Sequence, residues 1–580
     1  RSRGLGDVYK RQILKWDPTN QCDNGQNGSQ NYTGNVYLDC YKLNGTKLWR
    51  IDLGVNIRAG AHYTQFMVYD LDGDGKAEVA CKTAPGTIDG KGNNVIMGSD
   101  DPKADYRGTH GGKQGVIKTG PEYLTVFEGA TGKELSTVAY EPSRNILSDS
   151  AWGDSFGNRC ERYLACVAYL DGKKPSLVMC RGYYTAAYLC AWDFDGKELK
   201  KRWLHASTTK GEGAYGEGAH SLTVGDVDGD GCDEIVYGAC CIDHDGSVLY
   251  RTGLGHGDAL HLGDFIPDRE GLEVFMVHEE KSAAYGFEMR DAQTGEILSG
   301  RKMGSDIGRG LCADIDSLSR GAEYWSLAKF NMTSDGKYNS ITFDCNGDSI
   351  STKRPSVNFR TYWTGNLSEE LQEKGVISQW VNKTSSCTTV TDFVSTYGCG
   401  VNLIKDTPSL QADILGDWRE ECIYYDEKTK SNLMIFSTPF TSPYRVPCLM
   451  HDHIYRMSIC WQNVAYNQPP HLGYYLRDYV KYQQSNPTGI SRPVLTDEQS
   501  NVEIPFTLIS DGIVIRYTDM DNASSSIRVY SLDGLCVYHV TNRLQGSGEI
   551  KLEGLEGLKK GVYLLSVVVD GVKTVRKIIQ

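Results

Sequence analysis

Several features that mark other classes of protein are missing from this 580-residue sequence. No apolar run approaches the about 18 residues of a membrane-spanning helix, so no membrane span is expected. Helical periodicity is almost absent, which excludes a mainly helical fold. Its 61 basic residues are outnumbered by 74 acidic ones, for a formal charge of −13, which argues against nucleic acid as the main partner. Paired CxxC motifs are absent, so no structural zinc site is predicted.

Cysteine itself is not scarce, but its pattern lacks the tight spacing of a disulfide framework. The chain has 18 cysteines. Many of them, such as Cys166, Cys180 and Cys190, lie inside apolar runs that are typical of strands. We therefore interpret them mainly as buried free thiols that act as small hydrophobic residues, with a set of disulfides as the alternative.

What the sequence does contain is a series of short β-rich runs joined by turn residues. Asn-Gly, Asp-Gly and Thr-Gly turns between such runs are strong hairpin signals. Five copies occur, at residues 41–49, 127–135, 192–199, 242–249 and 290–298. From the third copy on they recur about every fifty residues, which is the period of a four-stranded propeller blade. The sequence therefore predicts an all-β propeller; its one expected helix is at residues 367–373.

Two acidic loops interrupt this series and have the pattern of calcium sites. Residues 226–234 (DVDGDGCDE) place acidic side chains at alternate positions, and residues 70–78 (DLDGDGKAE) repeat the arrangement. Hard oxygen ligands at this spacing, with a backbone carbonyl at the seventh position, suit Ca²⁺. The flanking β-branched residues indicate strands rather than the helices of an EF-hand. Weaker acidic loops follow at 264–273, 314–323 and 413–420. The predicted metal-binding residues are Asp70, Asp72, Asp74, Lys76, Glu78, Asp226, Asp228, Asp230, Cys232 and Glu234.

Composition divides the chain into segments. Residues 1–12 match nothing that follows, and we interpret them as foreign or scar sequence. Residues 13–482 form the expected propeller, and the composition of residues 483–500 predicts a linker. Residues 501–580 lack the acidic loops and are predicted to form a separate small β-sandwich.

Several stretches resemble rhamnogalacturonan lyases of polysaccharide lyase family 11. They are residues 15–20 (KWDPTN), 49–54 (WRIDLG), 57–66 (IRAGAHYTQF), 254–261 (LGHGDALH), 308–310 (GRG), 408–421 (PSLQADILGDWREE) and 461–471 (WQNVAYNQPPH). The resemblance implies an eight-bladed β-propeller, here incomplete at its N-terminal side, with several structural Ca²⁺ ions. It also implies a cleft for the acidic backbone of pectin. The chain departs from the family in having Leu403 and Ile404 before Lys405, where Gly-Thr is usual.

The last eighty residues resemble the sorting domain of type IX secretion substrates. The likeness rests on residues 561–563 (GVY) and on the closing basic and apolar run at residues 573–579 (KTVRKII). This resemblance implies export across an outer membrane. We therefore expect a protein that is secreted or held at the outer cell surface, and that acts as a monomer.

A lyase acting on this substrate must remove the C5 proton of a uronic acid while a cation neutralises the neighbouring carboxylate. On the resemblance, Lys405 is the candidate base or carboxylate clamp, Arg309 a bidentate carboxylate partner, and Tyr466 a sugar contact. The histidines at 62, 256, 261 and 278 are alternatives: one or two of them would bind a cation with Asp258 or Glu280, or replace Lys405 as base. The full set of expected substrate-binding residues is Asn20, Asn402, His62, His256 and Asp258, and His278 and Glu280 complete the expected metal ligands.

Two other functions stay open at this level. A calcium-stiffened adhesion or carbohydrate-binding propeller would share the acidic loops but would need no cationic base. A glycoside hydrolase would need two carboxylates at a fixed separation in the cleft. The first hypothesis is a secreted lyase that cleaves rhamnogalacturonan I, with endo or exo action left undecided by the sequence.

Overall fold

A computed structural model describes residues 11–22, 32–330, 339–402, 405–485, 506–509, 512–531, 536–552, 562–569 and 572–579. The chain divides into two compact units, Arg1–Val480 and Lys481–Gln580, each described here by itself. The division lies close to the boundary predicted at residue 482. Most of the predicted linker, at residues 486–500, is outside the described residues, whereas residues 483–485 belong to a helix.

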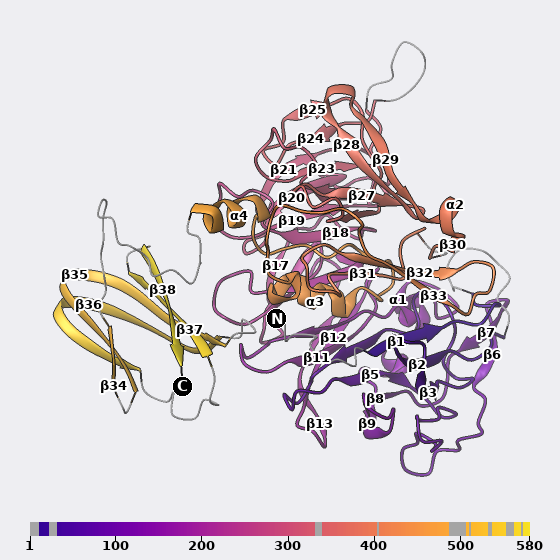
Figure 1. Ribbon diagram of the computed structural model, residues 1–580. Helices are drawn as coiled ribbons and strands as arrows, with labels where there is room; N and C mark the ends of the chain where they lie inside the picture. Colours follow the sequence, from indigo (N-terminus) through magenta and orange to yellow (C-terminus); the bar gives the residue numbers. More distant parts are fainter. Residues whose placement is uncertain are drawn as a thin grey trace. The chain divides into compact units, whose positions relative to one another are not determined.

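Within its described residues, the first unit contains eight antiparallel sheets that follow one another along the chain (Figure 1). The strands of the first four sheets are β1 (Arg11–Trp16), β2 (Tyr37–Lys42) and β3 (Lys47–Asp52); β4 (Phe66–Tyr69), β5 (Glu78–Thr83), β8 (Tyr123–Glu128) and β9 (Glu134–Ala139); β10 (Ala165–Ala168), β11 (Ser176–Arg181), β12 (Ala187–Phe194) and β13 (Leu199–Ser207); and β14 (Gly218–Gly225), β15 (Glu234–Gly238), β16 (Cys240–Ile242) and β17 (Val248–Arg251). A separate hairpin, β6 (Arg107–His110) and β7 (Lys113–Ile117), lies between β5 and β8 in the sequence. Strand β1 includes the last two residues of the segment interpreted as foreign, because Arg11 already pairs with Lys42.

The other four sheets repeat the plan. Their strands are β18 (Leu260–Gly263), β19 (Glu273–Val277), β20 (Phe287–Asp291) and β21 (Ile297–Arg301); β22 (Gly310–Ala313), β23 (Glu323–Ser326), β24 (Thr342–Phe343) and β25 (Ser349–Ser351); β26 (Phe359–Thr361), β27 (Glu370–Glu373), β28 (Val376–Val381) and β29 (Ser386–Asp392); and β30 (Cys399–Gly400), β31 (Leu410–Ala412), β32 (Glu421–Asp426) and β33 (Leu433–Phe436). In the last of them, β32 pairs with each of the other three strands.

The five predicted hairpins all form, and each joins the last two strands of a sheet. They connect β2 to β3, β8 to β9, β12 to β13, β16 to β17 and β20 to β21. Their glycines all have positive φ, for example +84° at Gly45 and +87° at Gly246, a backbone conformation that disfavours any residue with a Cβ. The period of about fifty residues in the sequence is therefore the period of the sheets.

A second repeat links two consecutive, paired strands in each of six sheets. In each, a buried glutamate opens the later strand and accepts backbone N–H groups from the loop that follows the earlier strand. These glutamates are Glu78, Glu234, Glu273, Glu323, Glu370 and Glu421. A carboxylate satisfies those N–H groups with hydrogen bonds each worth about 1.5–3 kcal/mol. We name them the glutamate staples. In the acidic loop predicted to end at Glu420, the staple is Glu421, and Glu420 instead pairs with buried Arg360 at 3.0 Å.

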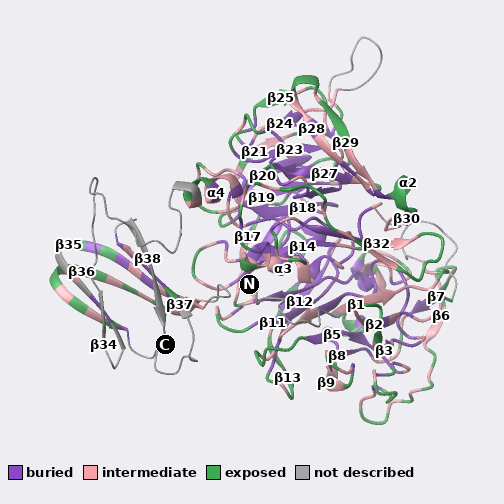
Figure 2. Cartoon of the chain, viewed as in Figure 1, coloured by how far each residue is buried: buried purple, intermediate pink, exposed green. Residues whose placement is uncertain are grey.

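The first strands of successive sheets contact one another, β4 with β10, β10 with β14, β14 with β18, β18 with β22 and β22 with β26. Most residues of these strands are buried, as Figure 2 shows for β14 and β18. The helix α3 (His453–Trp461) contacts β4, β10 and β14. The thiols of Cys166, Cys180 and Cys190 are free and buried in β10, β11 and β12, as predicted. The remaining helical segments are α1 (Asp149–Trp152), α2 (Phe393–Tyr397), α4 (Leu476–Ser485), and the 3₁₀ turns η1 (Arg144–Ile146), η2 (Arg159–Glu161), η3 (Asn382–Thr384) and η4 (Leu449–His451).

The helix predicted at residues 367–373 is wrong. Residues Glu370–Glu373 form strand β27, which pairs with β26 and β28. Glu370 is one of the glutamate staples, and its carboxylate accepts N–H groups from Trp363 and Thr364. Leu367 has φ +71°, which no α-helix tolerates. Tertiary hydrogen bonds thus override the helix propensity of the Leu, Glu and Gln residues in this segment.

The second unit has one five-stranded antiparallel sheet in its described residues. Its strands are β34 (Phe506–Ile509), β35 (Gly512–Ser531), β36 (Cys536–Leu552), β37 (Val562–Val569) and β38 (Val572–Ile579). The long β35 pairs with β34, β36 and β37. Ile527, Val529, Leu565 and Val567 are among the buried side chains of its core. The described part of this unit is all-β, as predicted; the sandwich arrangement stays a prediction.

Candidate active site

The candidate site lies where the first strands of several sheets begin. Because these strands contact one another, the residues just before them gather at one place. His220 lies at the start of β14, and several other contributing residues precede the first or inner strand of a later sheet. They are His256 and Asp258 before β18, Arg309 before β22, Asn358 before β26, and Lys405 before β31. The glutamate staples lie at the opposite ends of the same strands.

Lys405 lies between a carboxylate and an aromatic ring. Its Nζ is 3.0 Å from Asp258 Oδ2 and 4.2 Å from the centre of the Tyr466 ring. The Lys405 side chain is 23% exposed, whereas that of Asp258 is 10% exposed. The amine is therefore the part of this pair that a ligand from solvent reaches.

Tyr466 packs on a histidine that sequence reasoning missed. Its ring stacks on that of His220 with centroids 4.1 Å apart, and its N–H donates to the His220 carbonyl at 3.2 Å. His62 is also buried, with Nε2 3.2 Å from His220 Nδ1 and its ring 5.4 Å from that of Tyr466. The structure thus brings the predicted residues Lys405, Tyr466, Asp258 and His62 together around His220.

Two tyrosines after strand β11 complete the surroundings of His220. The Tyr183 hydroxyl lies 3.0 Å from His220 Nδ1, and the Tyr184 hydroxyl lies 2.9 Å from His220 Nε2. The Tyr184 ring also lies 4.2 Å from the His256 ring. Burial lowers the pKa of His220 well below its ordinary value, and the nearby His256 and His62 lower it further. A neutral imidazole is therefore favoured at this position.

Arg309 holds two loops of the site in place. Its Nη1 donates to the Asp258 carbonyl at 3.2 Å, and its Nε donates to Asn358 Oδ1 at 2.9 Å. Asn358 Nδ2 in turn donates to the Lys405 carbonyl at 3.0 Å. Only 4% of Arg309 is exposed. Burial lowers its pKa, and the charge of Asp258 opposes that effect.

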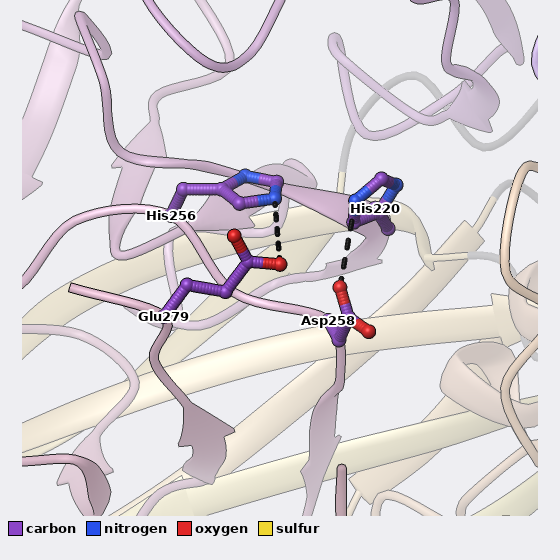
Figure 3. A group of neighbouring side chains, drawn as sticks. All are labelled: His220, His256, Asp258 and Glu279. Atoms are coloured by element: carbon purple, nitrogen blue, oxygen red, sulfur yellow. Dashed lines mark ion pairs between the residues drawn. The ribbon is translucent and has the colours of Figure 1, made fainter. Parts of the chain in front are cut away.

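Four side chains of the site could together hold a metal ion (Figure 3). His220, His256, Asp258 and Glu279 each offer a ligand atom, and these atoms all lie within 4.8 Å of one another. His220 Nε2 is 3.4 Å from Asp258 Oδ1, and His256 Nε2 is 3.8 Å from Glu279 Oε1. Burial lowers the pKa of His256 to about 4. Burial and the charge of Asp258 raise the pKa of Glu279.

This group fits a divalent cation. Metal ions bind the neutral form of imidazole together with carboxylates. His256 Nε2 is buried and has no hydrogen-bond partner among the described residues, as expected of a ligand atom. We name His220, His256, Asp258 and Glu279 the central cluster.

Comparisons with known proteins identify the family of this chain. Residues 5–486 match the model of "Rhamnogalacturonan lyase family 11, C-terminal domain". The chain belongs to rhamnogalacturonan lyase family 11. It is 52% identical to rhamnogalacturonan exolyase YesX of Bacillus subtilis over 486 residues, which cover 82% of this chain and 76% of that protein. It is 50% identical to rhamnogalacturonan endolyase YesW of the same organism over 480 residues, 82% of this chain and 73% of that one.

Solved structures give the same result. A rhamnogalacturonan lyase of Bacillus licheniformis is 51% identical, with a TM-score of 0.74 over 81% of this chain and 76% of that one. The chain is thus a polysaccharide lyase by family membership. Residues 509–580 match a secretion system C-terminal sorting domain. Among the described residues, no helix has the length and apolarity needed to cross a membrane.

The other predicted site histidines of the lyase lie in different surroundings. His278 is fully buried, with Nδ1 3.0 Å from the Gly255 carbonyl and Nε2 3.5 Å from Glu288 Oε1. His261 is buried, stacks on Phe275, and has its pKa lowered to about 3 by burial. Neither residue is part of the central cluster.

Glu279 contributes to the central cluster, whereas the predicted ligand Glu280 does not. Glu280 is exposed and accepts hydrogen bonds from the N–H and hydroxyl of Ser282. Two predicted asparagines lie in turns. Exposed Asn20 bonds the backbone of Tyr32 and Gly34. The backbone of Asn402 bonds Asp406 and Thr407 in the loop that carries Lys405.

The two strong acidic loops of the lyase share one backbone arrangement. Asp70 Oδ1 and Oδ2 accept the N–H groups of Gly73 and Gly75, and Asp226 does the same for Gly229 and Gly231. Asp70, Asp72 and Glu78 form one group that could hold a metal, and Asp226, Asp228 and Asp230 form another. The lysine at position 76 instead pairs with Asp74 at 3.2 Å. The acidic side chains of the two groups supply oxygen ligands, which fits Ca²⁺.

In two of the weaker acidic loops a carboxylate already pairs with an arginine. Arg269 Nη1 lies 2.8 Å from the staple Glu273, in the loop at residues 264–273. Arg477 Nε lies 2.6 Å from Asp314 Oδ2, in the loop at residues 314–323. An arginine thus neutralises a carboxylate in each of these loops. Calcium binding there stays a prediction.

Proposed function

We propose that this lyase cleaves the rhamnose–galacturonic acid backbone of rhamnogalacturonan I by β-elimination. The observation that carries the proposal is the position of Lys405. Its partly exposed amine lies beside Tyr466 and beside four residues suited to bind a cation. This reaction needs a base, a group that neutralises the uronate charge and a proton donor for the leaving oxygen.

In the proposed reaction, Lys405 Nζ takes the C5 proton of a galacturonic acid residue. The electron pair of the C5–H bond forms a double bond between C4 and C5, and the C4–O bond to the departing sugar breaks. The leaving oxygen takes a proton, for which the Tyr466 hydroxyl is our candidate donor. The products are a new unsaturated uronic acid end and a new hydroxyl end.

The uronate carboxylate must be neutralised before its neighbouring proton becomes acidic. We assign this task to Ca²⁺ held by the central cluster, which would stabilise the negative charge that develops on the carboxylate. Arg309 is better placed for a supporting role than for direct contact. It is buried, and through its bonds to Asp258 and Asn358 it fixes the loops that carry Asp258 and Lys405.

The proposed scaffold is an eight-bladed propeller in which each of the eight sheets is a blade. The successive contacts between first strands support this arrangement. We propose structural Ca²⁺ in the loops at residues 70–78 and 226–234, and secretion of a monomer directed by the C-terminal sorting domain. The match of residues 509–580 to a sorting domain supports that localisation.

One assay separates the lyase from the other two functions. Rhamnogalacturonan I is incubated with the protein, with and without a calcium chelator, and ultraviolet absorbance is followed together with reducing ends. The lyase produces absorbing unsaturated ends and new reducing ends in equal numbers, and chelation stops both. Reducing ends without absorbance would indicate a glycoside hydrolase. Release of neither, with retained binding of the polysaccharide, would indicate a binding propeller.

A further inference from the structure

The segment that precedes β10 carries two arginines at the end of the sheets where the candidate active site lies. In other sheets, the segments that precede first strands supply His256 and Asp258 before β18 and Arg309 before β22. Arg159 and Arg162 occupy the corresponding position before β10, and β10 contacts both β4 and β14. The fold therefore brings these arginines toward the same place as the site residues.

The ring of Tyr184 connects this segment with the central cluster. Its hydroxyl is 2.9 Å from His220 Nε2, and its ring centre is 4.2 Å from that of His256. Arg159 and Arg162 lie over the same ring, with their guanidinium carbons 5.3 Å and 5.9 Å from its centre. One aromatic ring thus contacts both the arginines and the residues suited to bind a cation.

The two arginines differ in what they already bind. Arg162 is only 3% exposed, and its Nη2 donates to Asn158 Oδ1 at 2.8 Å. Arg159 is half-buried, and none of the described carboxylates forms an ion pair with its guanidinium. Asp154, in the same loop, instead accepts three backbone N–H groups of that loop. Arg159 is therefore the arginine whose charge is available to a ligand from solvent.

The Arg159 guanidinium is packed against its neighbours. A Cβ at Gly153 would collide with Arg159 Nη1, so the guanidinium lies directly on the backbone of that glycine. The Tyr184 ring is its other neighbour. An arginine that is held in this way loses little further conformational freedom when it binds a ligand.

We propose that Arg159 binds the carboxylate of a second galacturonate of the substrate, one repeat along the chain from the galacturonate that reacts. This inference rests on the proposed function. Because the backbone alternates rhamnose and galacturonic acid, each further repeat presents a further carboxylate. A guanidinium offers parallel N–H donors that match a carboxylate, and stacking on an aromatic ring keeps these donors oriented.

Two separated sites for negative charge would give the enzyme a preference for long substrates. The central cluster and Lys405 hold the galacturonate that reacts, and Arg159 holds its neighbour. A substrate with a single galacturonate occupies the first site alone. Arg159 therefore contributes to affinity for the polymer and takes no part in the bond-breaking step.

Steady-state kinetics test this division of roles. Arg159→Gln removes both the charge and the parallel donors. With rhamnogalacturonan I as substrate, this variant should raise KM by at least about 10-fold, because it loses a charge-assisted hydrogen bond. Its kcat should stay within about threefold of the wild-type value, because the interaction is made equally in the ground state and the transition state.

Binding measurements separate failure of this inference from failure of the proposed function. Oligosaccharides are titrated calorimetrically into Lys405→Ala, with and without Arg159→Gln. Loss of Arg159 should weaken binding of an oligosaccharide with three galacturonates by at least about 10-fold and leave binding of one with a single galacturonate unchanged. If the wild type forms no unsaturated product, the proposed function fails, and the same titrations into the wild type still test Arg159.

Matched controls exclude a general effect of charge and a loss of structure. Arg202→Gln removes the same charge from an exposed position in β13, where Arg202 pairs with Asp193, and should change neither KM nor Kd. Thermal unfolding reports whether each variant folds, and Arg159→Met, which keeps the alkyl chain, replaces a glutamine variant that does not. Unchanged affinity for the longer oligosaccharide would overturn the proposal, as would an equal loss of affinity for both oligosaccharides.

Discussion

Replacing Lys405 with two different residues distinguishes its two proposed roles. Alanine removes both the charge and the proton acceptor. Arginine keeps the positive charge beside Asp258 but does not give up its proton at any working pH. A base therefore fails in both variants, whereas a carboxylate clamp fails in the alanine variant and works in large part in the arginine variant.

The structure sets the expected sizes of the two effects. Loss of a general base lowers kcat by about 10²–10⁴-fold, or about 3–5 kcal/mol in the barrier. The ion pair with Asp258 is partly solvated, with 23% of the lysine exposed, so its loss should cost no more than about 1 kcal/mol of folding stability. Asp258 also keeps His220 at 3.4 Å. Activity should thus fall far more than stability.

Initial rates of unsaturated product formation and urea unfolding measure the two quantities on the same preparations. Lys374→Ala is the matched control, because Lys374 is exposed and its backbone N–H bonds Asp406 in the loop that carries Lys405. It should leave the rate unchanged. If Lys405→Ala retains more than about a tenth of the wild-type rate, the base is another group, and His220 becomes the first candidate.

Three further outcomes are expected. Tyr466→Phe keeps the ring stacked on its histidine, so it should lower kcat by about 100-fold or more without changing the unfolding midpoint; an unchanged kcat would exclude the hydroxyl as proton donor. Arg360→Ala leaves buried carboxylates without their ion-pair partner and should lower the free energy of unfolding in urea by about 3–5 kcal/mol. A loss below about 1 kcal/mol would contradict this prediction. With calcium chelated, thermal stability should fall as pH rises from 4.5 to about 7. Burial raises the folded-state pKa of Glu78 and Glu421 to about 7, so each carboxyl group loses a stabilising proton in that pH window. A midpoint that rises there under chelation would refute the argument, and added Ca²⁺ should abolish the fall.

Local chemistry in the sequence was sufficient to predict the sheets. The turns at Gly45 and Gly246 have few alternative conformations, and the acidic loops fix strand ends through hydrogen bonds within about ten residues. The segment at residues 367–373 shows the limit of this reasoning. Its helix-forming residues become strand β27 because they pair with β26 and β28, and the periodicity of the segment does not encode that pairing.

The candidate site was predictable in part for the same reason. Resemblance to a family identified Lys405, Tyr466 and Asp258, which the structure places together. It did not identify His220, because nothing near that residue in the sequence shows that four other segments converge on it. The choice of Glu280 over Glu279 was an error of one position, and successive residues of an extended chain point to opposite sides.

The glutamate staples have a consequence for how this protein can change over time. They fix one end of the strands, while the reacting residues occupy the loops at the other end. Substitutions that change substrate preference therefore fall at different positions from those that change stability to heat or chelators. A mutant library restricted to the segments that precede β14, β18, β22, β26 and β31 should sample new specificities with few unfolded members, whereas the same mutational load placed around the staples should yield mostly insoluble chains.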